Sequence, residues 1–370
     1  MFSFFPKSRT VRLEPEKKKP TGFVTLSYLT APFLGAPDSA ARGHTNWQEC
    51  RVIAEAWRER GFCVEVVDRK DRRYAPPATA DAVVDLGVNL ERWAGGFAGG
   101  CRKILHATGA HWLTQNTAEL LRLENLKKRR GVSLFPRRQN IPNRGIESAD
   151  VACVLGNDFT IGSFLFAGRP VHRIPISSAY EFAWKAERDR EACRRRFLWI
   201  GSLGMVHKGL DLVLEAFAAR PHLHLTVCGR PEKEPDFWDA YRHELKELPN
   251  IHFEGWMDMG SPRFEEIRRT HGAVVYPSCS EGGGGAVIHC MHGGLVPLVT
   301  CAASVDTGNF GLAIAEGTVE EVGTALDSCA AWTPAELEAR SRATWEHARG
   351  NHSLAAFRGN YTRFLDQLLR

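Results

Sequence analysis

The chain has 370 residues, which is more than one hydrophobic core usually serves, so two domains are expected. Its composition, 44% hydrophobic and 25% charged, is that of an ordinary globular protein. The net charge of +5 is too small to indicate nucleic acid as a partner.

Membrane-spanning and secreted classes are also not expected. No run of about 18 apolar residues is present, and the N-terminal stretch lacks the apolar segment of a signal peptide. The ten cysteines are scattered without a Cys-x-x-Cys pair, as suits reduced thiols. We therefore expect a cytoplasmic protein.

The first half of the chain predicts a parallel, doubly wound sheet. Residues 1–20 are polar and basic and read as a poorly ordered arm. A strand at 21–30, a Pro/Gly loop, a helix at about 47–60 and a strand at 62–68 follow. Further elements are expected as strands at 81–87, 101–107, 150–156 and 171–178 and as a long helix near 114–130. Residues 21–180 therefore form the predicted N-terminal domain.

The second half repeats this alternation after a charged linker at about 180–195. Strands are expected at 197–202, 223–229, 251–255, 273–278 and 295–300, within a domain of residues 195–350. The tail from about 334 looks helical, and residues 351–370 could pack back on the first domain. The predicted fold class is α/β, with two Rossmann-like doubly wound domains facing a cleft at the carboxyl ends of their strands.

Two segments carry a resemblance to a known family. They read "FLWIGSLGMVHKGLDLVLEAF" (197–217) and "VVYPSCSEGGGGAVIHCMHGGLVPLVT" (274–300), with "VCGR" (227–230) and "NIHFEGW" (250–256) between them. This ordered set resembles the donor-binding domain of GT-B retaining glycosyltransferases of family 4, the glycosyl transferases group 1. The likeness covers about 195–320 well and is mainly architectural over 20–178.

The resemblance implies a glycosyltransferase whose donor is a nucleotide-diphosphate sugar of unknown base, with no cofactor and no metal. The donor phosphates would lie against a helix N-terminus at Gly282–Gly285, where free N–H groups stabilise negative charge. Lys208 would stabilise the leaving diphosphate, Glu281 would hold the sugar ring, and His106 would act near the transferred sugar, with His111 a poorer match. Further donor-side residues implied by the resemblance are Gly35, Ser202, Gly229, Arg230, Trp256 and His289. The acceptor would be a glycan or a lipid-linked molecule.

Two positions depart from the family pattern. Ser202 stands where an Arg usually follows the strand's Gly, and His289 replaces the Glu that usually holds the ribose hydroxyls. A neutral imidazole offers one acceptor, and its ordinary pKa near 6.5 predicts that donor affinity varies with pH. These departures keep open a catalytically silent binding module. A nucleotide-sugar epimerase is a second alternative, which would need carboxylates in the first-domain cleft.

Plainer interpretations accompany each of these residues. The four glycines could form only a flexible turn, Lys208 could be solvated, Glu281 could be a helix-start acid, and His106 could be a core histidine. His289 and His292 have the spacing of a metal pair on one helix face, without a clear carboxylate partner. The basic run Lys127–Arg138 is usually a solvated face, but it could dock on anionic lipid or hold a phosphorylated acceptor, which predicts peripheral membrane contact at the inner face.

Overall fold

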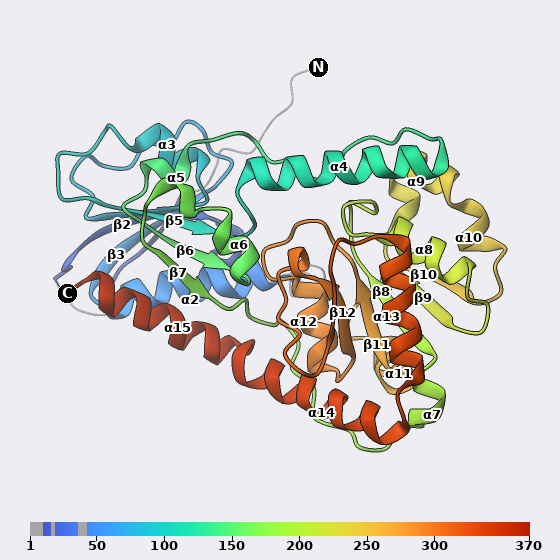
Figure 1. Ribbon diagram of the computed structural model, residues 1–370. Helices are drawn as coiled ribbons and strands as arrows, with labels where there is room; N and C mark the ends of the chain where they lie inside the picture. Colours follow the sequence, from blue (N-terminus) through green and yellow to red (C-terminus); the bar gives the residue numbers. More distant parts are fainter. Residues whose placement is uncertain (1–9, 16–18, 36–42) are drawn as a thin grey trace.

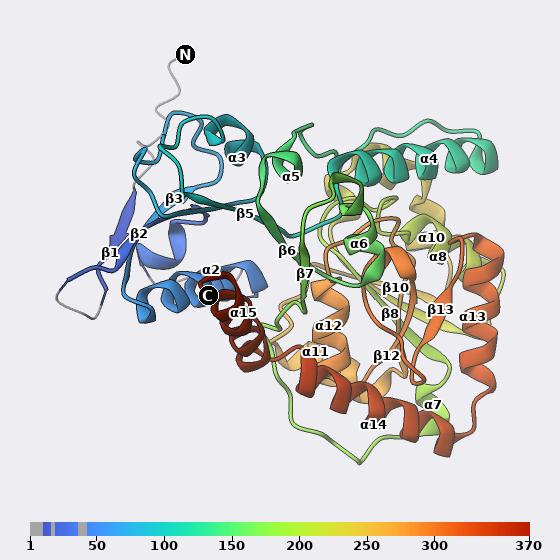
Figure 2. The same ribbon diagram turned by 60° about the vertical axis from the view of Figure 1, so that its left-hand side comes forward.

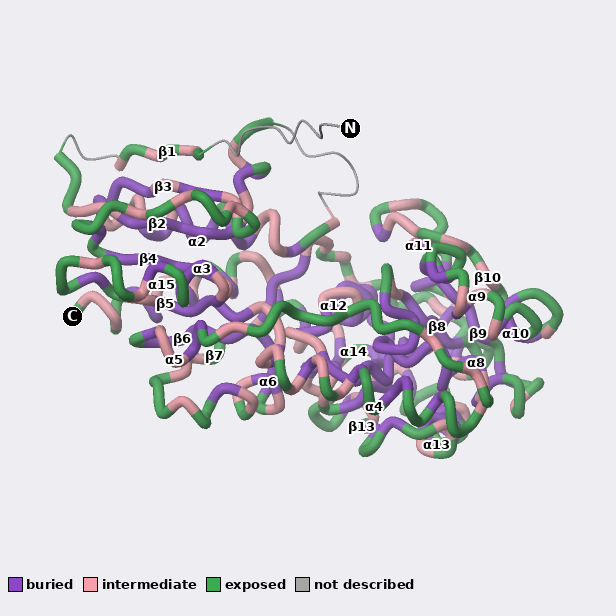
Figure 3. Tube along the Cα trace, turned by 90° about the horizontal axis from the view of Figure 1, so that it is seen from above, coloured by how far each residue is buried: buried purple, intermediate pink, exposed green. Residues whose placement is uncertain are grey.

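Two α/β domains make up the structure, a computed structural model that describes residues 10–15, 19–35 and 43–370 (Figure 1). Each domain is built on a largely parallel sheet whose strands are short apolar runs. Such runs are typical of sheets covered by helices on both faces. In both domains the strands are mostly buried (Figure 3). The predicted fold class is confirmed.

The N-terminal sheet holds six parallel strands and one antiparallel edge strand. In spatial order the strands are β1 (Val11–Leu13), β3 (Phe62–Asp68), β2 (Gly22–Tyr28), β4 (Ala82–Asp85), β5 (Arg102–Ala107), β6 (Val151–Leu155) and β7 (Val171–Ile174). The strand β1 lies within the predicted basic arm, so that prediction is wrong for Val11–Leu13. Both of these apolar residues pack against the core, which fixes the short strand on β3. The rest of the arm, 1–9 and 16–18, lies outside the described residues.

The C-terminal sheet is parallel throughout and has the strand order of a Rossmann domain. In spatial order its strands are β10 (Ile251–Gly255), β9 (His224–Cys228), β8 (Arg196–Ile200), β11 (Ala273–Tyr276), β12 (Val296–Thr300) and β13 (Leu312–Ile314). The sequence predicted the first five of these strands. It missed β13, because three residues at a sheet edge give too short an alternation to recognise.

Helices cover both sheets (Figure 2). In the first domain they are α2 (Thr45–Glu59), α3 (Val88–Trp93), α4 (Trp112–Arg130), α5 (Gly145–Ser148) and α6 (Asp158–Gly162). In the second they are α7 (Arg190–Cys193), α8 (Leu210–Ala218), α9 (Pro235–Ala240), α10 (Arg242–Lys246), α11 (Pro262–Thr270), α12 (Gly285–His292) and α13 (Val319–Ala331), followed by α14 (Pro334–Asn351) and α15 (Leu354–Leu368). None of the described helices is long and apolar enough to cross a membrane.

The last helix returns to the first domain. Helix α14 packs on α12 and β12 of the second domain, whereas α15 packs along α2 and reaches β7. Phe357 and Tyr361 of α15 are fully buried in this contact. Arg60, which follows α2, donates to the Asp366 carboxylate at 2.5 Å. The N-terminal domain is therefore completed by residues from the far end of the sequence.

A second crossing is made by α4. This helix starts at the edge of the first domain and extends over the second, with its C-terminal end beside α9 and α10 (Figures 1 and 2). The chain after α4 then returns along it, since Asn140 N–H donates to Asn116 and Gln139 donates to Glu119. Residues of the N-terminal half thus form part of the surface of the C-terminal domain.

Candidate active site

A cleft of about 860 Å³ lies between the domains, lined by residues of both. It opens where the order of strands reverses in each sheet, between β2 and β4 and between β8 and β11. Ligands of open α/β sheets bind at such positions. The end of β4 and the loop after it contribute Asp85 and Leu86 on one side, and the loops after β8 and β11 contribute Gly201, Ser202 and Glu281 on the other.

Lys208 and Glu281 form a buried ion pair in the wall of this cleft. Lys208 Nζ donates to Glu281 Oε1 at 2.7 Å and to the hydroxyl of Tyr276 at 2.7 Å. The same carboxylate oxygen accepts from the hydroxyls of Tyr276 at 2.9 Å and Ser278 at 3.2 Å. One oxygen of Glu281 therefore accepts hydrogen bonds from three donors. Lys208 and Glu281 lie next to each other, as the sequence predicted.

The charges of this pair are mutually stabilised. Burial by itself would raise the pKa of Glu281, but the adjacent Lys208 ammonium, with His207 and Arg138, lowers that pKa to about 2. Burial also lowers the pKa of Lys208, and Glu281 opposes that shift. Glu281 thus stays ionised at neutral pH. Because its carboxylate lies 2.7 Å from Lys208 Nζ, the positive charge of Lys208 is already paired.

The glycine run opens helix α12. Gly284 is its N-cap with φ of +55°, a left-handed conformation that glycine adopts most readily. The N–H groups of Val287 and Ile288 already bond to the Gly284 carbonyl, so the open N–H groups of the first turn are those of Gly285 and Ala286, both at the cleft. The predicted helix N-terminus is present and faces the cleft.

The reason for the glycines differs in part from the expectation. A Cβ at Gly282 would collide with the carbonyl of Thr108 in the other domain, and one at Gly283 would meet Ile176 at 2.8 Å. A Cβ at Gly284 would lie 2.7 Å from Val305, whereas Gly285 has no atom closer than 3.6 Å. Close approach of the two domains therefore requires glycine at positions 282 and 283, and packing within the C-terminal domain requires it at 284, in addition to any ligand.

Of the remaining residues predicted to bind the donor, some line the cleft and others do not. Ser202, Gly229 and Trp256 line the cleft. Arg230 is not in the lining, and its guanidinium lies 5.3 Å from the ring centre of Trp256. Gly35 is exposed and also outside the lining, and the loop that it begins, 36–42, lies outside the described residues.

The prediction of His106 as a catalytic residue is wrong. Its side chain is fully buried, with Nδ1 3.2 Å from the Cys153 thiol and rings of Tyr28 and Tyr361 around it. Burial lowers the pKa of His106 to about 4. Side chains alternate along a strand, so Ala107 reaches the cleft while His106 points into the layer of α15. His111, the poorer match, does line the cleft.

His289 lines the cleft, but its ring nitrogens have protein partners. Nε2 accepts from the backbone N–H of Ala179 at 3.1 Å, and Nδ1 lies 3.3 Å from the Met259 sulfur. Burial, with His292 and His44, lowers the pKa of His289 to about 3. The expected pH dependence of ligand binding near 6.5 is therefore wrong for this residue, and its acceptor nitrogen is used by Ala179. His292 contacts the His352 carbonyl instead, and no group of three or more metal-binding side chains occurs among the described residues.

The basic run predicted to dock on a membrane is largely engaged with the C-terminal domain. Arg129 pairs with Asp211 at 2.9 Å and Glu215 at 3.0 Å on α8. Arg130 pairs with Glu244 of α10, and Arg137 with Asp236 of α9, each at 2.5 Å. The docking-face prediction is wrong for these three arginines, whose charges hold α4 on the second domain.

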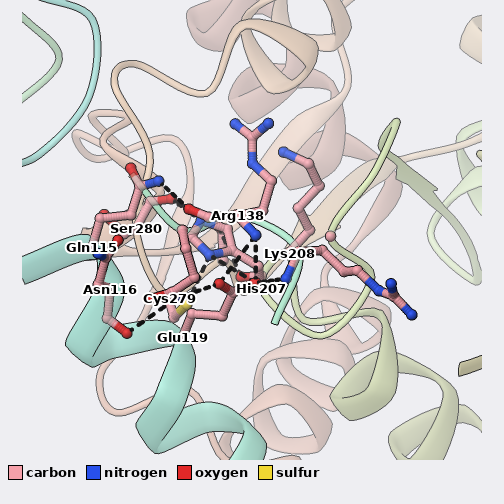
Figure 4. Close-up of polar contacts among 12 residues, drawn as sticks. Gln115, Asn116, Glu119, Arg138, His207, Lys208, Cys279 and Ser280 are labelled. Atoms are coloured by element: carbon pink, nitrogen blue, oxygen red, sulfur yellow. Dashed lines mark hydrogen bonds and ion pairs between the residues drawn. The ribbon is translucent and has the colours of Figure 1, made fainter. Parts of the chain in front are cut away.

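The sequence did not predict a polar cluster that lies between α4 and the C-terminal domain (Figure 4). Buried Glu119 of α4 accepts the backbone N–H groups of Arg137 and Arg138, each at 2.9 Å. Next to it, His207 contacts the Ser280 carbonyl through Nε2, and burial lowers the pKa of His207 to about 4. No signal in the sequence links Glu119 to a segment 18 residues later. The cluster places Arg138 in the lining of the cleft.

Comparisons with known proteins bear on the C-terminal domain and on the fold. The model of the family "Glycosyl transferases group 1" matches residues 194–331, the C-terminal domain from β8 to α13. Sucrose-phosphate synthase from Thermosynechococcus elongatus superposes with a TM-score of 0.64 at 14% identity, over 95% of this chain and 99% of that one. Anabaena HepE, solved with UDP and glucose, gives 0.56 at 12% identity, over 93% and 99%.

A third solved structure is larger. A mutant of S. aureus TarM, in complex with fondaparinux, α-GlcNAc-glycerol and UDP, gives a TM-score of 0.52 at 10% identity. The match covers 76% of this chain and spans only 54% of TarM. No curated protein sequence matches the chain. The C-terminal domain thus matches the glycosyl transferases group 1 family, and the chain has the two-domain GT-B fold of these structures.

Proposed function

We propose that this protein transfers a sugar from a nucleotide-diphosphate sugar to a hydroxyl of a glycan or lipid-linked acceptor, without a metal ion and with retention of the anomeric configuration. The observation that carries the proposal is the meeting of Lys208, Glu281 and the open N-terminus of α12 in one cleft. A helix N-terminus and a cation stabilise the charge that grows on a departing diphosphate. Two of the superposed structures contain UDP, which makes UDP the first nucleotide to test.

In the proposed reaction the bond between the anomeric carbon and the diphosphate oxygen breaks, and a bond to the acceptor oxygen forms. The acceptor proton passes to the leaving phosphate. Retention is supported by Asp85 and Glu281, two carboxylates of the described lining that each accept several hydrogen bonds and are therefore weak bases. Asp85 accepts the N–H groups of Gly87, Asn89 and Leu90 and is not placed as a general base.

Asp85, the carboxylate that the first domain contributes to the described lining, is occupied by three backbone N–H groups, which argues against an epimerase with a free acid and base in that domain. A silent binding module remains the second candidate, because Ser202 lacks a charge and His289 uses its acceptor on Ala179. We further propose a reducing, cytoplasmic environment, since all ten cysteines are free and only Cys301 is exposed.

The test begins with thermal shift against UDP, GDP and ADP, because a ligand that binds only the native state raises the melting temperature. The sugar conjugates of the best nucleotide are then incubated with the protein, and nucleotide release is measured with and without EDTA. Binding with slow release that survives EDTA supports the proposal. Binding without release favours the silent module, and release abolished by EDTA contradicts metal independence.

A further inference from the structure

The loop after β8 lacks a charged side chain where the resembled family carries one. Ser202 lies in this loop, lines the cleft and is neutral. The other cation of the donor side, Lys208, is already neutralised by Glu281 at 2.7 Å. His207, next to it, is uncharged at neutral pH because burial lowers its pKa to about 4. Lys208 can still donate one of its three N–H groups to a diphosphate here, but these residues together carry no net positive charge.

Arg138 brings a positively charged side chain to this loop from the other domain. Its side chain crosses the same loop, since a Cβ at Gly204 would lie 2.5 Å from Arg138 Cγ and 3.0 Å from its Cδ. Gly204 has φ of +85°, so glycine both shapes the turn and leaves room for the arginine. Arg138 lines the cleft and acts electrostatically on both Lys208 and Glu281. Figure 4 shows Arg138 and Lys208 extending in the same direction, away from Glu119.

The backbone of Arg138 is fixed by buried groups while its guanidinium is not engaged. Glu119, 2% exposed, accepts the Arg138 N–H at 2.9 and 3.1 Å, and Gln115 donates to the Arg138 carbonyl at 2.6 Å. Within the described part of the chain the guanidinium makes no hydrogen bond or ion pair, unlike those of Arg129, Arg130 and Arg137. A held backbone with an open planar fork is suited to an anionic ligand with several oxygens.

We propose that Arg138 binds the diphosphate of the donor and replaces, from the N-terminal domain, the cation that Ser202 does not provide. The inference rests on the proposed function and assigns a residue that sequence comparison of the donor domain would not find. Because Arg138 belongs to the first domain and α12 to the second, the diphosphate would be held by both. Donor binding is therefore coupled to the contact of the domains.

The test measures calorimetric affinities for the best-binding nucleoside diphosphate, for its nucleoside and for inorganic pyrophosphate, which needs no knowledge of the base. In Arg138→Gln we expect diphosphate and pyrophosphate affinity to fall about 10- to 100-fold, the usual effect of losing charged hydrogen bonds, with the nucleoside unaffected. Arg138→Lys keeps the charge but lacks the planar fork of the guanidinium. Its affinity for the diphosphate should lie between those of the unmodified protein and Arg138→Gln. Lys128→Gln removes one charge from exposed α4 and serves as the matched control.

Each outcome has one meaning. Failure of the unmodified protein to bind any nucleoside diphosphate or pyrophosphate overturns the proposed function and the inference with it. Binding that is unchanged in Arg138→Gln overturns the inference and leaves the function standing. Equal loss for diphosphate and nucleoside, or a lowered melting temperature, would mean that Arg138 acts on the structure and also overturns the inference. Loss restricted to the two diphosphate ligands establishes it.

Discussion

The side chains of Lys208 and Glu281 meet at 2.7 Å, although 73 residues separate them in the chain. Lys208 follows β8 and Glu281 follows β11, and these neighbouring parallel strands end at the same edge of the sheet. The pair is nearly enclosed, with 8% of the Lys208 side chain and 13% of the Glu281 side chain exposed. Removing either charge therefore leaves the other without its partner in a place of low dielectric.

Lys208→Ala should lower turnover by about 100- to 1,000-fold, with a smaller rise in the donor Michaelis constant. The reason is that negative charge on the leaving diphosphate is greatest in the transition state, where a preorganised cation stabilises it most. Steady-state kinetics with the sugar conjugate of the nucleotide that binds best measure both constants. A variant that keeps its turnover and loses only donor affinity would show that Lys208 binds the ground state and transition state equally.

Gly285 and Gly284 give a matched pair of substitutions at the mouth of α12. Gly285→Val should fold normally, because the nearest atom to a new Cβ is 3.6 Å away, and should weaken nucleoside diphosphate binding by crowding the open N–H groups. Gly284→Val should instead lower the free energy of unfolding by more than about 1 kcal/mol, since φ of +55° is unfavourable for a branched residue.

The two variants are compared by urea unfolding and by calorimetric titration. We expect a binding defect with normal stability for Gly285→Val and a stability defect for Gly284→Val. Undiminished diphosphate affinity in a folded Gly285→Val protein would remove the helix N-terminus from the binding site.

Arg129→Gln should lower the free energy of unfolding by about 1–3 kcal/mol. The loss arises because Asp211, which is fully buried, would lose its ion pair and keep only the nearby charge of Arg122. Urea denaturation measures it. The neighbouring Lys128→Gln is the control, since its contact with Glu124 is exposed and 3.9 Å long and should change stability by less than about 0.5 kcal/mol. Similar losses in both variants would show that the interdomain pair is not what stabilises this region.

Stability should decrease as the pH falls below 6.5. Burial keeps His106 neutral in the folded protein, with its pKa lowered to about 4, whereas in the unfolded chain it titrates near 6.5. Between these values the unfolded state binds the extra proton, so the free energy of unfolding falls with pH, by about 2 kcal/mol at pH 5 for this residue. Compared with the unmodified protein, His106→Leu should lose less stability between pH 7 and pH 5. An identical decrease in both proteins would exclude His106 as a source.

The sequence predicted those parts of the molecule that depend on local pattern. Apolar runs such as Phe62–Asp68 give the strands directly, and the order of strands and helices gives the two parallel sheets. Lys208 and Glu281 could be placed near each other because the ends of neighbouring strands meet. His106 was misassigned because the position of a residue near a strand end does not say which face its side chain takes. His289 could not be assigned a titration range without knowing its burial.

What could not be predicted depends on contacts between distant segments. The arginines after Lys128 read as a free charged surface, because nothing local shows that Asp211, Glu244 and Asp236 come to meet them. The same holds for Arg138, whose position follows from the buried carboxylate of Glu119. A run of charged residues in the sequence shows how many charges are present. The tertiary structure is needed to show which of them are already paired within the protein.

The placement of α15 on α2 has a consequence for the synthesis of the protein. The apolar face of α2 is made among the first 60 residues, but Phe357 and Tyr361, which cover it, emerge from the ribosome about 300 residues later. Domains generally fold as units while the chain is being made, at roughly 5–20 residues per second. For about 15–60 s, therefore, the nascent first domain exposes a surface that α15 later covers. We expect this interval to be the time when chaperones bind the chain, and shortening the protein before Leu354 should make that exposure permanent.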